Sequence, residues 1–231
     1  MGSILSDPKI WGIVFLSLKV SALAMLVVVP LAVVVARWLA KPGLRGKALL
    51  SALVHLPLVL PPVVTGYGLL LIFGRRGWVG SYLDQFGISF MFSWTGAALA
   101  AGLMAFPLVV RPIRLAFETQ DSRLEDIAAT LGASRWRRFV TIALPLAWPG
   151  VLAGLVLGFA KALGEFGATI TFVSNIPYET QTLSLAIYTL LQSPSGDRAA
   201  ITLIGISICL SFLAILASEW TMVVMERKRE R

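Results

Sequence analysis

The chain has 231 residues and a formal net charge of +8; 57% of its residues are hydrophobic and only 14% are charged. Soluble domains are about 45–50% apolar and about 25% charged, so this composition excludes an ordinary water-soluble domain. The basic charge leaves two interpretations open: a surface for nucleic acid, or the cytoplasmic anchors of a membrane protein.

Apolar stretches close to the ~20 residues needed to cross hydrocarbon recur along the chain. They predict an all-α membrane protein, with a single domain over residues 1–231 and five spans at about 11–36, 49–73, 95–110, 146–172 and 199–224. The first stretch is too long for the apolar region of a signal peptide, and its N-terminal flank is not enriched in positive charge. Lys19 lies within this stretch, near enough to one end for its ammonium to reach the interface.

Five spans place the two termini on opposite sides of the membrane. If the polar loop 122–145 is cytoplasmic, most of the 20 lysines and arginines fall on the cytoplasmic side. Because cytoplasmic loops carry an excess of basic residues, this distribution predicts an N-out, C-in orientation. It also explains the positive charge without nucleic acid, for which the sequence contains no recognisable binding motif.

Prolines and glycines interrupt the second predicted span at Pro57, Pro61, Pro62, Gly66 and Gly68. Each proline removes a backbone donor and crowds the preceding turn, so we expect the helix to kink or unwind here. In lipid, the freed backbone groups are tolerated only where protein or a water-filled cavity receives them. Broken helices of this kind line transport pathways, and the alternative is a kink that only shapes packing.

The polar loop contains signals for a short helix. Ser122 and Glu125 match a capping box that would start the helix, and Gly132 suits the left-handed residue that ends one. The residues between them form one apolar face, made of Leu124, Ile127, Ala128 and Leu131. Ser134 is a second N-cap candidate, and Pro145 suits the start of the fourth span. The loop is therefore either a basic connector lying on lipid headgroups or a helix offered to a cytoplasmic protein.

The spacing of this loop resembles that in the membrane subunits of ABC importers. Their loop reads Glu-Ala-Ala, three residues, Gly, nine residues, Ile, one residue and Leu-Pro. The matching residues are Asp126, Ile127, Ala128, Gly132, Ile142, Leu144 and Pro145. Asp126 and Ile127 depart from the pattern, and Glu125 lies beside Asp126 and can share the acidic role.

In that family the loop forms a coupling helix that sits in a cleft of the ATPase subunit. The resemblance therefore implies a set of ATPase-coupling residues, namely Ser122, Leu124, Glu125, Asp126, Ala128, Leu131, Gly132, Ile142, Leu144 and Pro145. Two further segments, 53–67 and 162–175, are similar to the molybdate importer permeases in particular, and the second is also similar to the sulfate permeases.

These likenesses imply a permease subunit of the type I ABC importer fold that forms the translocation pathway for molybdate in the bacterial inner membrane. The alternative substrates are sulfate or thiosulfate, and tungstate. The implied partners are a second copy of this chain, two copies of a cytoplasmic ATPase that holds ATP-Mg, an extracytoplasmic oxyanion-binding protein and the surrounding lipid.

Lys161 and Glu165 lie four residues apart in the fourth predicted span and can pair on one helix face. Ionisable groups within spans are usually functional, but a glutamate exposed in the pathway would repel an oxyanion, which favours a structural ion pair. The full set of pathway or gate candidates is Pro61, Pro62, Thr65, Gly66, Lys161, Glu165, Gly167, Thr169, Thr171, Ser207 and Ser211.

No Gly-x4-Gly-Lys-[Ser/Thr] motif occurs, so we expect ATP hydrolysis to belong to a partner and not to this chain. One histidine and one cysteine cannot form a metal cluster, and we expect no cofactor bound by this chain. The alternatives of a different class are an intramembrane enzyme and a stand-alone channel or secondary transporter, and the polar loop argues against both.

Between the last two spans, residues 178–193 include an apolar part too short to cross the membrane, which is either re-entrant or interfacial.

Overall fold

The computed structural model describes residues 7–194 and 196–229, and the regular structure within them is helical. Four helices in this part of the chain are long and apolar enough to cross a membrane: Pro8–Ala40, Trp94–Glu118, Arg135–Leu163 and Asp197–Ala217. The bent pair Lys47–Val59 and Pro62–Phe73 adds a fifth crossing if it is counted as one span. The predicted all-α membrane fold is confirmed.

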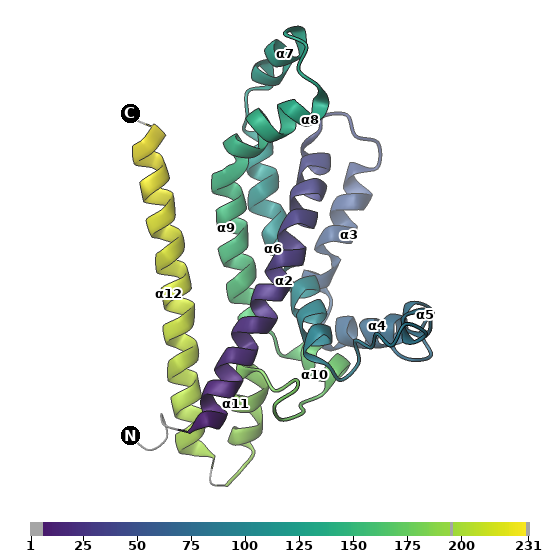
Figure 1. Ribbon diagram of the computed structural model, residues 1–231, viewed down its shortest axis with the longest axis vertical. Coiled ribbons are helices and arrows are strands. Elements are labelled where there is room, and N and C mark those ends of the chain that lie inside the picture. Colours follow the sequence, from purple (N-terminus) through teal and green to yellow (C-terminus); the bar gives the residue numbers. More distant parts are fainter. Residues whose placement is uncertain (1–6, 195, 230–231) are drawn as a thin grey trace.

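The elements in chain order are α2 (Pro8–Ala40), α3 (Lys47–Val59), α4 (Pro62–Phe73), α5 (Trp78–Asp84), α6 (Trp94–Glu118), α7 (Ser122–Thr130), α8 (Arg135–Arg138), η1 (Phe139–Ala143), α9 (Leu144–Leu163), α10 (Gly167–Val173), α11 (Leu183–Leu191) and α12 (Asp197–Arg229). Figure 1 shows α7 beyond one end of the long helices and α11 at the other end. We call these the α7 end and the α11 end. Helix α2 begins at the α11 end and α12 finishes at the α7 end, so the described chain starts and stops on opposite sides (Figure 1).

Helices α2, α6 and α9 form the centre of the bundle and pack through small residues. Ala97, Ala101 and Ala105 of α6 are buried. A Cβ on Gly154 of α9 would lie only 2.8 Å from the carbonyl oxygen of Val109, so α9 and α6 are in backbone contact there. Small residues allow this close approach, on which helix association in lipid depends.

Helix α12 contacts α9 and α11, shares a buried apolar cluster with the start of α2 through Leu203, and otherwise stands apart from the bundle (Figure 1). Only 11% of its most apolar window is buried. Both α12 and α2 extend beyond the predicted spans 199–224 and 11–36 at each end. The helices that contain the first and last predicted spans are therefore longer than the predicted spans.

The second predicted span, 49–73, is two helices: α3 and α4, which meet at 111°. Leu60 precedes Pro61 and is extended, with φ −69° and ψ 141°, as expected for a residue whose α conformation clashes with a following proline ring. The chain therefore leaves the helix at Leu60 and re-enters it at Pro62. The kink predicted from the prolines is confirmed, and it is a sharp break.

The prediction for the third span, 95–110, is wrong at its C-terminal end, because α6 continues through Arg111 and Pro112 to Glu118. A proline inside a helix removes one backbone hydrogen bond, a loss that neighbouring helices offset in membrane proteins. Helix α9 packs against this turn, since a Cβ on Gly150 would lie 2.7 Å from the Pro112 carbonyl oxygen.

The prediction for the fourth span, 146–172, is wrong at both ends. Helices α8, η1 and α9 follow one another without a break, so one helix runs from Arg135 to Leu163. The π-helical turn η1 widens the helix just before Pro145, whose ring would crowd the carbonyl four residues earlier. The helix then stops at Leu163, and α10 is a separate element that begins at Gly167.

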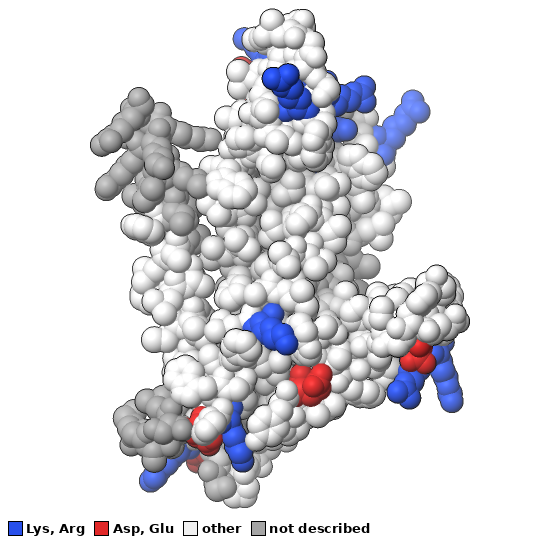
Figure 2. Space-filling model, in the orientation of Figure 1, with Lys and Arg blue, Asp and Glu red and all other residues white. Residues whose placement is uncertain are grey.

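Figure 2 shows that charged side chains on this face gather toward the two ends of the molecule, while few lie between them. Basic side chains are visible at both the α7 end and the α11 end. Helix α2 exposes large apolar side chains along its length, such as Phe15, Leu26 and Val34, as expected for a helix that lies against lipid.

Candidate functional site

The N-terminus of α7 differs from the prediction. Asp121 is the N-cap, and its Oδ1 accepts a hydrogen bond from the Arg123 backbone N–H at 3.0 Å, while Ser122 is the first helical residue. The predicted capping box between Ser122 and Glu125 is therefore wrong. Aspartate and serine are both good N-caps, and the Glu125 carboxylate that would have closed the box binds another residue.

The C-terminus of α7 follows the sequence signal. Gly132 has φ +83°, which side chains with a Cβ rarely adopt. Its N–H donates to the Ala129 carbonyl at 3.0 Å, and the N–H of Ala133 donates to the Ala128 carbonyl at 2.9 Å. These two bonds form a Schellman motif that satisfies the last carbonyls of the helix.

The apolar face of α7 has no covering element in the described chain. No residue of α7 is buried, and the side chains of Leu124, Ile127 and Leu131 are 45%, 58% and 82% exposed. Asp126 is exposed as well. A helix that exposes an apolar face beyond the end of its own bundle is suited to enter a groove of another protein.

A salt bridge fastens α7 to the bundle. Arg37, in the last turn of α2, donates from Nη2 to both carboxylate oxygens of Glu125 at 2.5 and 2.6 Å. Arg138 also donates to the backbone carbonyl of Glu125 at 3.3 Å. The Arg37 guanidinium lies 5.4 Å from the centroid of the Phe117 ring, which packs it against the end of α6. Sequence reasoning missed Arg37, because no spacing rule links residues so far apart.

The remaining coupling candidates lie where the polar loop rejoins the bundle. Ile142 and Leu144 are half-buried and Pro145 is exposed, at the junction of η1 and α9. Gln120 donates from Nε2 to the Ala143 carbonyl at 2.9 Å and ties the two ends of the loop together. These residues are in a position to hold the base of the loop and do not belong to the exposed face of α7.

At the other end of the bundle, the structure brings two groups of pathway candidates together where α4 packs on α10. A Cβ on Gly66 would lie 2.6 Å from the Ala168 carbonyl oxygen and 2.9 Å from Cβ of Thr171. A Cβ on Gly167 would lie 2.6 Å from Cβ of Pro62. Both glycines are thus needed for the close approach of the two short helices. We call this contact the elbow.

Three threonine hydroxyl groups lie on the two helices that form the elbow. Thr65 and Thr169 are buried, and Thr171 donates to the Gly167 carbonyl at 2.8 Å. Oγ1 of Thr65 has no hydrogen-bond partner within the described chain. Pro61 precedes α4 as its N-cap and completes this group.

Lys161 and Glu165 form an ion pair beside the elbow, with Nζ to Oε2 at 2.5 Å. The Glu165 side chain is 2% exposed and that of Lys161 is 31% exposed. Oε1 of Glu165 accepts a second hydrogen bond from the Ala168 backbone N–H at 3.1 Å. Both carboxylate oxygens are thus engaged in contacts that join α9 to α10.

Ser207 and Ser211 do not join this group. They lie on α12, which contacts α9 and α11 but is separate from α4 and α10 (Figure 1). The structure therefore does not bring the eleven pathway candidates of the sequence into one cluster within a single chain.

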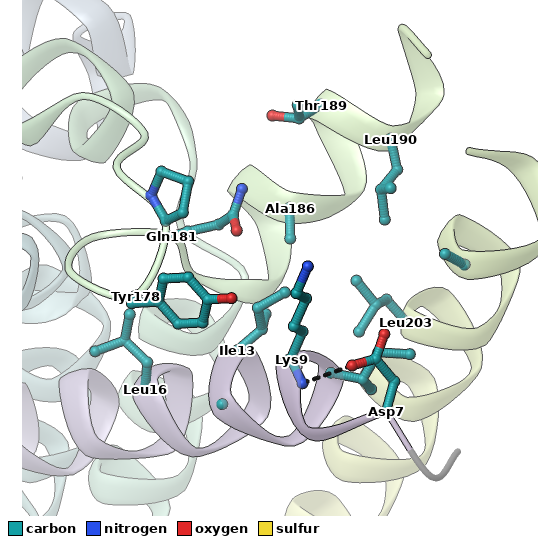
Figure 3. Close-up of a pocket in the computed structure, with 14 residues that line it drawn as sticks. Asp7, Lys9, Ile13, Leu16, Tyr178, Gln181, Ala186, Thr189, Leu190 and Leu203 are labelled. Atoms are coloured by element: carbon teal, nitrogen blue, oxygen red, sulfur yellow. Dashed lines mark hydrogen bonds between the residues drawn. The ribbon is translucent and has the colours of Figure 1, made fainter. Parts of the chain in front are cut away.

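A cavity of about 570 Å³ opens at the α11 end, among the start of α2, the loop before α11, α11 and α12. Figure 3 shows the side chains of Lys9, Tyr178 and Gln181 around it, with apolar lining residues such as Ile13 and Leu203 beside them. None of the residues predicted from the sequence lines it.

Comparison with known proteins identifies the family. A family model described as "Binding-protein-dependent transport system inner membrane component" matches residues 14–228. The chain belongs to this family. It is therefore a multi-helix inner membrane component of a binding-protein-dependent transport system, which confirms the resemblance drawn from the polar loop.

Two molybdenum transport permeases are similar to this chain over almost its whole length, and a sulfate transport permease is similar over a shorter part. The molybdenum transport system permease protein ModB of Escherichia coli K12 is 58% identical over 218 residues, which are 94% of this chain and 95% of that protein. ModB of Haemophilus influenzae is 56% identical over 92% of this chain and 93% of its own length. The sulfate transport system permease protein CysT of E. coli is 37% identical, over 72% of this chain and 61% of that protein.

Solved structures agree on the fold of the permease. A bacterial alginate ABC transporter, crystallised with an alginate-bound periplasmic protein, matches with a TM-score of 0.74 and 20% identity, covering 94% of this chain and 79% of that one. The MetNI methionine ABC transporter matches with a TM-score of 0.69 and 15% identity over 94% of both chains. The permease therefore has the fold of ABC importer membrane subunits.

Proposed function

We propose that two copies of this chain form a translocation pathway for molybdate in an ATP-driven importer. The support for molybdate is the 58% identity to an E. coli molybdenum transport permease along nearly the full length of both proteins. Tungstate is an oxyanion of the same kind. Sulfate is the second candidate, since a sulfate transport permease is 37% identical over a shorter part of the chain.

The observation that carries the proposal is α7, a well-capped helix with an exposed apolar face and no buried residue. In the proposed assembly, this face enters a cleft of a cytoplasmic ATPase subunit that holds ATP-Mg, with one ATPase for each permease copy. The α7 end is then cytoplasmic, which corresponds to an N-out, C-in orientation. Arg123, Arg135, Arg137 and Arg138 in and just after α7 support this orientation, because basic residues favour the cytoplasmic side.

The mechanism follows from what α7 contacts. Closure of the ATPase pair on ATP would move α7, and the Arg37–Glu125 pair would pass that movement to α2. The continuous helix from Arg135 would pass it along α9 toward the elbow. Opening and closing of the elbow would then switch the pathway between its inward-open and outward-open forms.

We assign the gate to the elbow, with Pro61, Pro62, Thr65, Gly66, Gly167, Thr169 and Thr171 as its residues. Lys161 and Glu165 hold α9 to α10 beside it. Ser207 and Ser211 could face the same pathway only from a second copy, because their own α12 is separate from the elbow. An extracytoplasmic oxyanion-binding protein would deliver the substrate at the α11 end.

A pathway needs only weak contacts, since an ion that binds tightly cannot leave. Selectivity among oxyanions therefore belongs mainly to the binding protein. The deciding experiment reconstitutes the permease with its ATPase and binding protein in vesicles. We expect molybdate to stimulate ATP hydrolysis and to accumulate inside.

Stimulation by sulfate and not by molybdate would replace the proposed substrate with the second candidate. Uptake driven by an ion gradient, with the permease alone in the vesicles, would instead reject the ATP-driven mechanism and support a secondary transporter. A control in which the binding protein is omitted separates substrate delivery from transport.

A further inference from the structure

Lys19 is an exposed cation of the membrane-crossing helix α2, nearer to the N-terminus of that helix than to its centre. Its Nζ lies 3.5 Å from the centroid of the Trp94 ring, where the ring face attracts a cation. Lys19 is not a member of any of the ion pairs found among residues 7–194 and 196–229. Since an ammonium group has three donors, the side away from the ring is available to bind an anion.

An apolar groove begins one helical turn from Lys19. It has a volume of about 550 Å³ and lies between α2 and α6. Its walls include Leu23, Val27 and Leu31 of α2 and Leu99, Leu103 and Phe106 of α6. Gly102 lies on its floor, where an added Cβ would come within 3.1 Å of Val28.

The length of the groove matches one leaflet of a bilayer. Its α6 wall runs from Thr95 to Phe106, which corresponds to roughly 16 Å at 1.5 Å per residue. Half of the roughly 30 Å hydrocarbon core is about 15 Å. Trp94 lies next to the end of the groove nearest Lys19, and tryptophan is enriched at the headgroup level.

We propose that this groove binds an anionic phospholipid, with the phosphate on the Lys19 ammonium and one acyl chain between α2 and α6. The charge of Lys19 selects an anionic headgroup, and the uncharged walls fit a hydrocarbon chain. Trp94 holds the ammonium at the headgroup level of the leaflet on the α11 side. This inference concerns lipid binding and does not depend on the transported ion.

The first experiment measures lipid retained by the full-length permease purified from bilayers of phosphatidylglycerol and phosphatidylethanolamine, by native mass spectrometry. We expect retained phosphatidylglycerol, and an apparent affinity about fivefold lower for Lys19→Gln, as expected when one lysine near a membrane surface is lost. Lys19→Arg keeps the charge and should retain the lipid. Lys9→Gln, on the same helix, is the matched control and should bind as the unchanged chain does.

Equal phosphatidylglycerol binding by Lys19→Gln and the unchanged chain would overturn the proposal. A second experiment locates the acyl chain with a fluorophore on Val27→Cys in a Cys209→Ser background. Brominated phosphatidylglycerol should quench this label more than brominated phosphatidylethanolamine does, and the difference should vanish with Lys19→Gln. Disulfide cross-linking of Val27→Cys between two copies would show that a second copy fills the groove, which would also reject the lipid.

Discussion

Arg37 at the end of α2 and Glu125 in α7 form an ion pair across 88 residues of sequence. Their side chains keep 27% and 22% exposure, and exposed ion pairs contribute about 0–1 kcal/mol to stability. The pair therefore adds little to the stability of the fold. Its importance lies in fixing the position of α7, which no buried side chain anchors.

The first prediction exchanges the charges of this pair. Arg37→Glu places two carboxylates together, and we expect substrate-stimulated ATPase activity of the reconstituted complex to fall by about fivefold or more, a typical size for a coupling energy. The double variant Arg37→Glu with Glu125→Arg should recover much of it. Lys47→Gln, which breaks the separate exposed pair with Glu118, is the control. If Arg37→Glu loses no coupling, the pair does not position α7.

The second prediction concerns the left-handed residue that ends α7. Gly132→Asp should abolish uptake or ATPase coupling while membrane insertion stays intact, because a charge would enter the proposed ATPase cleft. Gly132→Asn has nearly the same size and also tolerates φ +83°, so it should keep partial activity. Uptake assays and quantification in the membrane fraction measure both effects. Normal transport by assembled Gly132→Asp would refute the docking role.

The third prediction uses two glycines of α4. In Gly66→Ala the new methyl group would lie 2.6 Å from a backbone oxygen of α10, so the helices must separate at a cost of about 1–3 kcal/mol. Thermal unfolding in detergent should shift down by about 2–4 °C for each kcal/mol, and uptake should fall. Nothing lies within 4 Å of a Cβ on Gly68, so Gly68→Ala should unfold at an equal or higher temperature. Equal stability of the two variants would contradict the elbow contact.

The fourth prediction separates a structural from a pathway role for Lys161 and Glu165. Removing one partner of a fully buried pair costs about 3–5 kcal/mol, and we expect less here because Lys161 is 31% exposed. Glu165→Gln and Lys161→Gln should each lower the unfolding temperature, and the double variant should lose less than their sum. If Lys161→Gln instead raised the KM for the oxyanion without a change in stability, the lysine would belong to the pathway.

Local signals in the sequence predicted several features well. The prolines indicated the break between α3 and α4, because a missing N–H and a crowded ring act within one turn. Gly132 indicated the end of α7, since few other residues adopt its backbone conformation. The spacing of Lys161 and Glu165 indicated their ion pair, which forms although α9 ends at Leu163 and Glu165 lies beyond it.

Features that depend on distant residues were not predictable in the same way. Asp121 and not Ser122 is the N-cap of α7, and Glu125 binds Arg37, 88 residues away, instead of closing a capping box. The continuation of α6 past Pro112 depends on packing against α9. No periodic pattern in the sequence indicates either contact. One sequence alone also carries no covariation between positions that could reveal them.

The uninterrupted helix from Arg135 to Leu163 has a mechanical consequence. At 1.5 Å per residue, about 40 Å of helix connects Arg135 beside α7 to Lys161 beside the elbow. A rigid rod of this length turns a small tilt at one end into a larger sideways displacement at the other, whereas a flexible loop would absorb it. The π-helical turn at Phe139–Ala143 lies near the α7 end, so bending there would tilt the rest of the rod as one piece.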